Sequence, residues 1–200
     1  MTNKRESASE GISAAELMAQ LANDKEYQSQ RAIFKRDLAE RKAVWRAAEE
    51  PIVAELRAVG VELDSVWDLV NTDVPYPSAM PVLIRYLEDG ELPDRMLEGL
   101  GRALAVGPAI EFWDRLIALR LSPASAGQAE GSAVALAACV TPDRVDDLIR
   151  IVTEEERRPE HIFFLRPILK LGGDRGREVL ASLDADPVLA VEAQALLSGG

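Results

Sequence analysis

The stretch PSAMPVLIRYLEDGELPDRMLEGLGRALAV, residues 77–106, decides the fold. It holds two apolar segments with helical spacing, separated by a short break that contains Gly90 and Pro93. Leu, Ala and Met favour helices, whereas Gly and Pro interrupt them. The stretch therefore predicts a helix–turn–helix unit. A single pair of helices cannot bury its own apolar face, so the unit needs stacked neighbours.

The same unit recurs along the chain with a period of 32 or 33 residues. One leucine anchors each first helix: Leu83, Leu116, Leu148 and Leu180. Another anchors each second helix: Leu104, Leu136 and Leu169, followed by Leu196 in a shortened last unit. Two interleaved series with one period predict an all-α protein. We expect a short right-handed α-solenoid of stacked helix pairs over residues 61–200.

The period, the paired helices and the sequence pattern of residues 77–106 resemble HEAT-type (HEAT/armadillo-like) helical repeats. Proline early in a first helix and Asp94-Arg95 opening a second helix are similar to those repeats, as are the Ala-rich second helices. The resemblance covers roughly residues 73–198, and the chain departs from it in its short units and in Pro167. What the resemblance implies is a fold used as a scaffold or binding surface, and fold alone does not give function.

Residues 1–60 have a different character. Residues 1–12 are polar and predict a disordered tail, and residues 13–60 predict a helical segment. Ser13 and Glu16 form a capping box, and one long helix is expected over residues 25–59, although Pro51 could divide it in two. Its narrow apolar stripe needs a partner. The helix either caps the solenoid or serves as a coiled-coil arm that makes a homodimer through residues 25–59.

The net charge of -11 lies entirely after residue 60, because residues 1–60 hold ten basic and ten acidic residues. An acidic body argues against nucleic acid and against anionic membranes as partners, and favours a protein partner, possibly a basic one. The N-terminus carries no secretory signal, and there is one cysteine. A reducing cytoplasm is therefore the expected location.

The sequence predicts no catalytic residues, no metal site and no cofactor. His161 is the single histidine and is expected near a helix start, and Cys139 reads as a buried structural thiol. Some HEAT-like DNA glycosylases use aromatic and acidic residues, but Trp113 falls on an apolar helix face here. Glu154, Glu155 and Glu156 read as a solvated turn that the following arginines neutralise.

Three hypotheses for function remain open. The first is a non-enzymatic scaffold that binds a protein partner, and the second is an immunity-type inhibitor or regulatory partner of a basic enzyme. The third is an enzyme of unknown type, which would need a pocket with at least two ionisable groups of shifted pKa. We expect partner binding on the row of second helices, through these exposed side chains: Arg95, Glu98, Arg102, Glu130 and Arg166.

Overall fold

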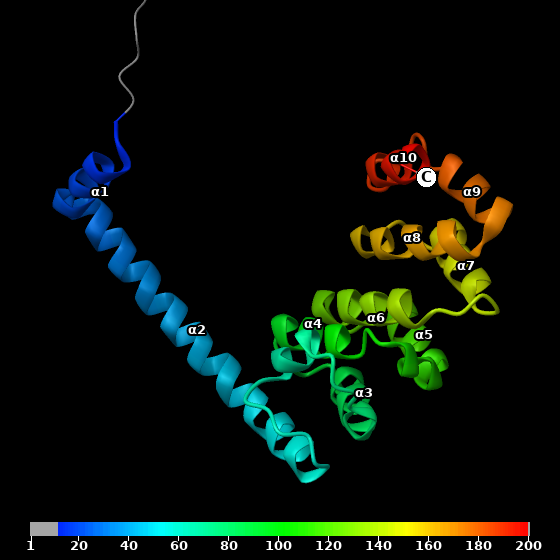
Figure 1. The fold of residues 1–200 in the computed structure, drawn as a ribbon, viewed down its shortest axis with the longest axis horizontal. Helices are drawn as coiled ribbons and strands as arrows, with labels where there is room; N and C mark the ends of the chain where they lie inside the picture. Colours follow the sequence, from blue (N-terminus) through cyan, green and yellow to red (C-terminus); the bar gives the residue numbers. More distant parts are fainter. Residues whose placement is uncertain (1–11, 200) are drawn as a thin grey trace, which may run out of the picture. The chain divides into compact units, whose positions relative to one another are not determined.

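A computed structural model describes residues 12–199, and it is built from helices, with no strand among those residues (Figure 1). The all-α prediction is confirmed. The chain divides into two compact units, the first ending at Val44 and the second beginning at Trp45. The predicted tail, apart from Ile12, lies outside the described residues.

The first unit consists of α1 (Ala14–Asn23) and the N-terminal part of α2 (Lys25–Ala58). The predicted capping box is present, since the Ser13 hydroxyl accepts from the Glu16 amide and the Glu16 carboxylate accepts from the Ser13 amide. Asp24 separates the two helices and caps α2 by accepting from the amides of Glu26 and Tyr27. No residue of α1 is buried.

The rest of α2 belongs to the second unit, where Ile52, Val53 and Leu56 are buried. The helix passes through Pro51 without a break. Pro51 is exposed, and so is Ala47, whose carbonyl loses its helical donor there and can pair with water. Gly60 follows the helix with a left-handed φ of 86°, as its place after the last apolar residue predicts.

Residues 61–79 contain no α-helix. Within residues 61–72, only Val66–Asn71 forms a helical segment, a 3₁₀ helix (η1) that Ser65 and Asp68 cap. Pro77 does not open the next α-helix directly. It begins a 3₁₀ turn (η2, Pro77–Ala79) that leads into α3, because a proline at the first position suits either kind of turn.

Four helix pairs follow, at the predicted places. Their first helices are α3 (Met80–Asp89), α5 (Trp113–Leu121), α7 (Val145–Glu154) and α9 (Gly173–Ala181). Their second helices are α4 (Asp94–Ala103), α6 (Ala126–Cys139), α8 (Ile162–Leu171) and α10 (Ala190–Ser198). Two further 3₁₀ turns, η3 (Gly107–Phe112) and η4 (Pro159–His161), lead into α5 and α8.

The second helices pack against one another in chain order. α4 contacts α6, α6 contacts α8, and α8 contacts α10, while each first helix contacts the second helix of its own pair. The anchoring leucines Leu83, Leu104, Leu116 and Leu136 are completely buried between these layers. The periodic leucines therefore form the core that the sequence predicts.

Ion pairs link each first helix to the first helix of the pair before it, and link α3 to α2. The arginines and their acidic partners are Arg85 with Glu55, Arg115 with Glu88, Arg144 with Asp114, and Arg175 with Asp146. Trp113 on α5 also donates to Asp147 on α7, with 3.0 Å between Nε1 and Oδ2. We call the four ion pairs the arginine ladder. Each ion pair is exposed and contributes little stability by itself, but one such pair occurs at every first helix.

The closest contact between helices is that of α4 with α6, and glycines make it possible. A Cβ on Gly101 would lie 2.1 Å from the Gly131 Cα, and one on Gly127 would lie 2.4 Å from the Asp94 Cα. Both distances are far below van der Waals contact, and the obstructing atoms are backbone atoms, which cannot move aside. Gly99 likewise leaves room for the Trp67 ring, 3.1 Å from the place of a Cβ. Gly99 and Gly101 thus permit close packing.

We expect Gly101→Ala to lower the free energy of unfolding by about 2–3 kcal/mol, because the two helices must separate to admit the methyl group. Gly107→Ala is the matched control. A Cβ there meets nothing within 4 Å, so stability should change by less than about 1 kcal/mol. Urea denaturation measures both variants, and equal midpoints would show that the α4–α6 contact is not tight.

Candidate protein-binding surface

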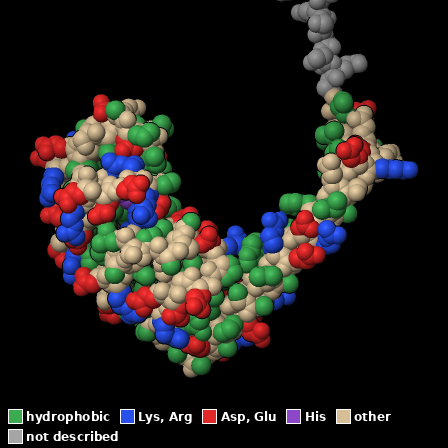
Figure 2. All heavy atoms as spheres, turned by 180° about the vertical axis from the view of Figure 1, so that it is seen from behind, with side chains coloured by type: hydrophobic (Ala, Val, Ile, Leu, Met, Phe, Trp, Pro, Cys, Tyr) green, Lys and Arg blue, Asp and Glu red, His purple; other side chains and the backbone are tan. Residues whose placement is uncertain are grey.

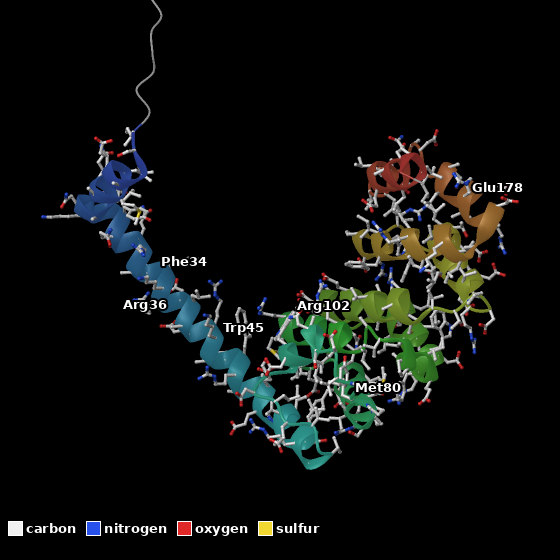
Figure 3. All side chains as sticks on the ribbon, in the orientation of Figure 1. Phe34, Arg36, Trp45, Met80, Arg102 and Glu178 are labelled. Carbon is white, nitrogen blue, oxygen red and sulfur yellow. The ribbon has the colours of Figure 1, made fainter. Side chains whose placement is uncertain are left out.

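Four of the five predicted binding residues lie on the neighbouring helices α4 and α6. Arg95, Glu98 and Arg102 are three and four residues apart, which places them on one face of α4, and Glu130 lies on α6. Figure 3 shows Arg102 on the side of α4 that points away from α3. With Trp45 and Trp67, these residues form what we call the α4–α6 patch.

Arg95 lies between two tryptophan rings. Its guanidinium carbon is 5.0 Å from the centre of the Trp45 ring and 4.9 Å from that of Trp67. Both distances fit cation–π contacts, which hold a flexible arginine in one place. Trp45 and Trp67 are half-buried and Arg95 is exposed. The patch therefore presents a fixed cation framed by aromatic surface.

The other end of the patch is an ion pair beside a second carboxylate. Arg102 Nη2 donates to Glu130 Oε1 at 2.7 Å. Glu98 is half-buried next to this pair, and its pKa is raised, first by burial and then by the negative charge of Glu130. The positive charge of Arg102 thus acts on two carboxylates. A cation from a partner would relieve their repulsion.

Arg166 is not part of this patch. It is exposed on α8 and makes no ion pair with any residue that the structure describes. The two tryptophans were not among the predicted binding residues, since Trp45 belonged to the helical stripe and Trp67 to a short apolar set. Their distance from Arg95 in sequence, 50 and 28 residues, hides the contact from any local pattern.

An open groove of about 330 Å³ lies beside the loop before α3. It is lined mainly by apolar residues, among them Val74, Met80 and Pro108, and its ionisable lining residues are Asp73 and Tyr76. The Tyr76 hydroxyl is fixed by donating to the Ala103 carbonyl at 2.7 Å. Such a groove can hold an apolar side chain but offers no acid–base pair.

A buried polar cluster lies where α5, η4 and the loop after α9 meet. Arg120 is 3% exposed and lies 3.7 Å from Glu160, and Arg157 pairs with Asp186 at 2.6 Å. The interpretation of residues 154–158 as a self-neutralising turn is thus wrong for Arg157, which turns inward because the Val152 carbonyl and Asp186 both accept from it. The adjoining hollow measures about 20 Å³, room for about one water.

His161 is completely buried in that cluster, at the predicted helix start. Neither ring nitrogen has a hydrogen-bond partner among the described residues. Burial, followed by the nearby charges of Arg120, Arg157 and Arg158, lowers its pKa to about 4. The imidazole is therefore neutral at pH 7 and acts as a packed ring beside Phe164, 6.1 Å between ring centres.

Cys139 is buried, as predicted, and burial raises the pKa of its thiol to about 12. A thiol in that state is neither a nucleophile nor a ready metal ligand. Among residues 12–199 no group of three His, Cys, Asp or Glu side chains is arranged to hold a metal ion. In the same range, no helix is both long and apolar enough to cross a membrane.

Comparison with known proteins adds no relative: no family model, no curated protein and no solved structure matches the chain.

We expect Arg95→Ala to lower the free energy of unfolding by about 1 kcal/mol and to change the tryptophan emission, because the cation leaves two indole rings. Arg166→Ala is the control, since it removes the same charge from an exposed site on α8. Both effects are measurable in one fluorescence-detected denaturation. If both variants behave alike, the Arg95 stack does not form in solution.

We also expect His161 to make the protein less stable in acid. The unfolded state binds a proton on this histidine below its ordinary pKa of 6.5, whereas the folded state does so only below about 4. Stability therefore falls as pH drops from 6.5 to 4, by roughly 3 kcal/mol from this group.

His161→Leu removes that contribution and leaves no buried polar nitrogen. The free energy of unfolding of the variant, measured by urea denaturation between pH 7 and 5, should depend on pH less steeply than that of the parent chain. A parallel pair of curves would show that His161 is accessible to protons in the folded state.

Proposed function

We propose that this protein is a non-enzymatic protein-binding module, a short HEAT-like solenoid whose second helices α4, α6 and α8 form the binding surface. The observation that carries the proposal is the α4–α6 patch. Tryptophan and arginine are the residue types that most often dominate binding energy at protein interfaces. Here Trp45, Arg95 and Trp67 form one stacked group at the surface.

Rigidity supports the same proposal. The patch lies across the two helices that glycines bring into backbone contact, so the side chains stand on a support that cannot easily shift. Arg95 and Arg102 are already held by the tryptophans and by Glu130. A surface fixed before binding loses less conformational entropy when a partner arrives.

The charges on the patch favour a partner with a basic side chain. Glu98 and Glu130 share Arg102, and burial followed by the negative charge of Glu130 raises the pKa of Glu98. The net charge of -11 would attract a basic protein over a longer range and speed its association. Figure 2 shows acidic and basic side chains interspersed over the C-terminal helices, so no single-sign patch covers that face.

An inhibitor or immunity-type partner of a basic enzyme is the second candidate, and the same net charge supports it. The two candidates share the surface and differ in what binding does. In the inhibitor case the captured partner is an enzyme that loses activity when bound. A reducing cytoplasm remains the proposed location, because the single thiol, Cys139, is buried and free.

The test is photocrosslinking in cells, with the photoreactive residue placed at Val134 on α6 or at Arg150 on α7. Val134 lies one turn beyond Glu130, whereas Arg150 is exposed on a first helix. The partner should be captured from position 134 and not from position 150. Capture from position 150 alone would place binding on the wrong side of the helix pairs.

The captured partner is then purified and titrated against variants. We expect Arg95→Glu with Arg102→Glu to weaken binding at least about tenfold, as loss of central interface residues does. Arg177→Glu with Arg175→Glu, on α9, makes the same change in charge outside the patch and should weaken binding less than about twofold. Equal losses in both double variants would show a purely long-range charge effect and contradict the proposal.

A further inference from the structure

One apolar stripe runs along the whole of α2. Its members recur with a spacing of 18 residues, which is five helical turns, so each pair lies at the same angle around the axis. The pairs are Tyr27 with Trp45, Phe34 with Ile52, and Leu38 with Leu56. Figure 3 shows Phe34 and Arg36 on opposite sides of the helix.

The two halves of this stripe differ in burial. Ile52 and Leu56 are completely buried in the core of the second unit. Phe34 is 61% exposed, and no residue of α2 before Ile52 is buried within the described chain. The side chains of Ile33 and Val44 add exposed apolar surface beside the stripe, which is visible along the helix in Figure 2. The face that makes a core in one half thus continues uncovered in the other.

The flanks of the exposed half carry unlike charges. The stripe positions in this half are residues 27, 31, 34, 38, 41 and 45. One flank holds the residues that follow positions 27, 34 and 41, namely Gln28, Lys35 and Lys42. The other flank holds the residues that precede positions 31, 38 and 45: Gln30, Asp37 and Val44. One flank is therefore basic, and the other carries the only acid, which has consequences for how two such helices can pair.

We propose that the exposed stripe, residues 27–42 of α2, binds a second copy of this chain as a parallel, two-stranded coiled coil. The stripe proposed for pairing stops short of Trp45, which stacks on Arg95 in its own chain. In a parallel pair the opposite flanks of the two helices meet, so Asp37 of one copy faces Lys42 of the other, twice by symmetry. In an antiparallel pair like flanks meet, and Lys35 faces Lys42. Glu49 could offset that repulsion, but its carboxylate already accepts from Ser65 and Val66 in its own chain.

The stripe favours two strands over more, and protein over lipid. Arg31 and Arg41 lie at stripe positions, and a long arginine stem can pack in the seam of a dimer while its charge reaches water, which the closed core of a larger bundle prevents. Insertion into lipid requires a wide apolar face, whereas the stripe on α2 is narrow and has arginines at two of its own positions, Arg31 and Arg41.

The first experiment measures the mass of the full chain by light scattering and sedimentation over a range of concentrations. We expect a dimer, and we expect Phe34→Lys to raise its dissociation constant at least about 100-fold, because two buried phenylalanines are lost. Ile33→Lys is the matched control. Ile33 is also an exposed apolar residue, but it precedes Phe34 by one position and therefore lies about 100° away from it around the helix. It should change the constant less than about fivefold.

The second experiment tests the orientation. Tyr27→Cys should form a disulfide-linked dimer under mild oxidation, because residue 27 meets its own copy only in a parallel pair, and the buried Cys139 does not compete. Asp37→Lys should weaken the dimer roughly threefold or more, and adding Lys42→Asp should restore it.

Four outcomes would overturn the proposal: a monomer at all concentrations, a dimer indifferent to Phe34, a dimer that Tyr27→Cys does not link under oxidation, or a monomer that binds phosphatidylserine vesicles through Phe34. Circular dichroism melting of each variant checks that the second unit stays folded, as it should, since the changed residues lie outside its core.

Discussion

The backbone contact between α4 and α6 is the constraint on which the second unit depends. Gly101 and Gly131 let the two helices touch without intervening side chains, and Gly127 does the same against Asp94. The contact also receives polar support, because the Asp94 carboxylate accepts from the Gly127 amide at 3.0 Å. Gln128 extends this junction by donating to the Leu87 carbonyl at the end of α3. The three helices α3, α4 and α6 thus meet at one close crossing, and the residues of the α4–α6 patch stand directly on it.

The two rows of helices differ in what they do with charge. On the first helices, arginines of the arginine ladder face acids of the preceding first helix, so local charge is largely neutralised between neighbours. On the second helices, Arg102 stands between two carboxylates, and Arg95 has aromatic rings in place of an acid. Charges that pair along the row contribute to the stacking of the units. Charges with incomplete partners remain available to another molecule, which distinguishes the second-helix surface from the first.

Much of the fold could be predicted from the sequence because its signals are local or periodic. The leucine period placed all eight helices of the four pairs, and Ser13, Asp24 and Gly60 marked helix ends through the hydrogen bonds and dihedral angles that those residues favour. The charge on Arg95 could be predicted to matter, but its tryptophans could not, since that contact depends on how three separate segments pack. The burial of His161 could not be predicted from the sequence, for a similar reason. A histidine after Pro-Glu suggests a turn, and only the docking of residues 183–189 and of Arg120 around it closes the site.

The long helix shows why the choice between cap and dimerisation arm could not be made from the pattern alone. A stripe of constant angle is what either role requires, and α2 keeps that angle from Tyr27 to Leu56. The residues beside the stripe differ between its two halves. Near Ile52 they include Val53, also buried, whereas near Phe34 they include Arg31, Lys35 and Arg41, whose charges require water within reach. A core inside one chain excludes such residues, but the narrow seam between two helices accepts them at its edges. The change from apolar to charged neighbours along one unbroken stripe is therefore what the proposed dimer requires of a helix whose other end belongs to the core of its own chain.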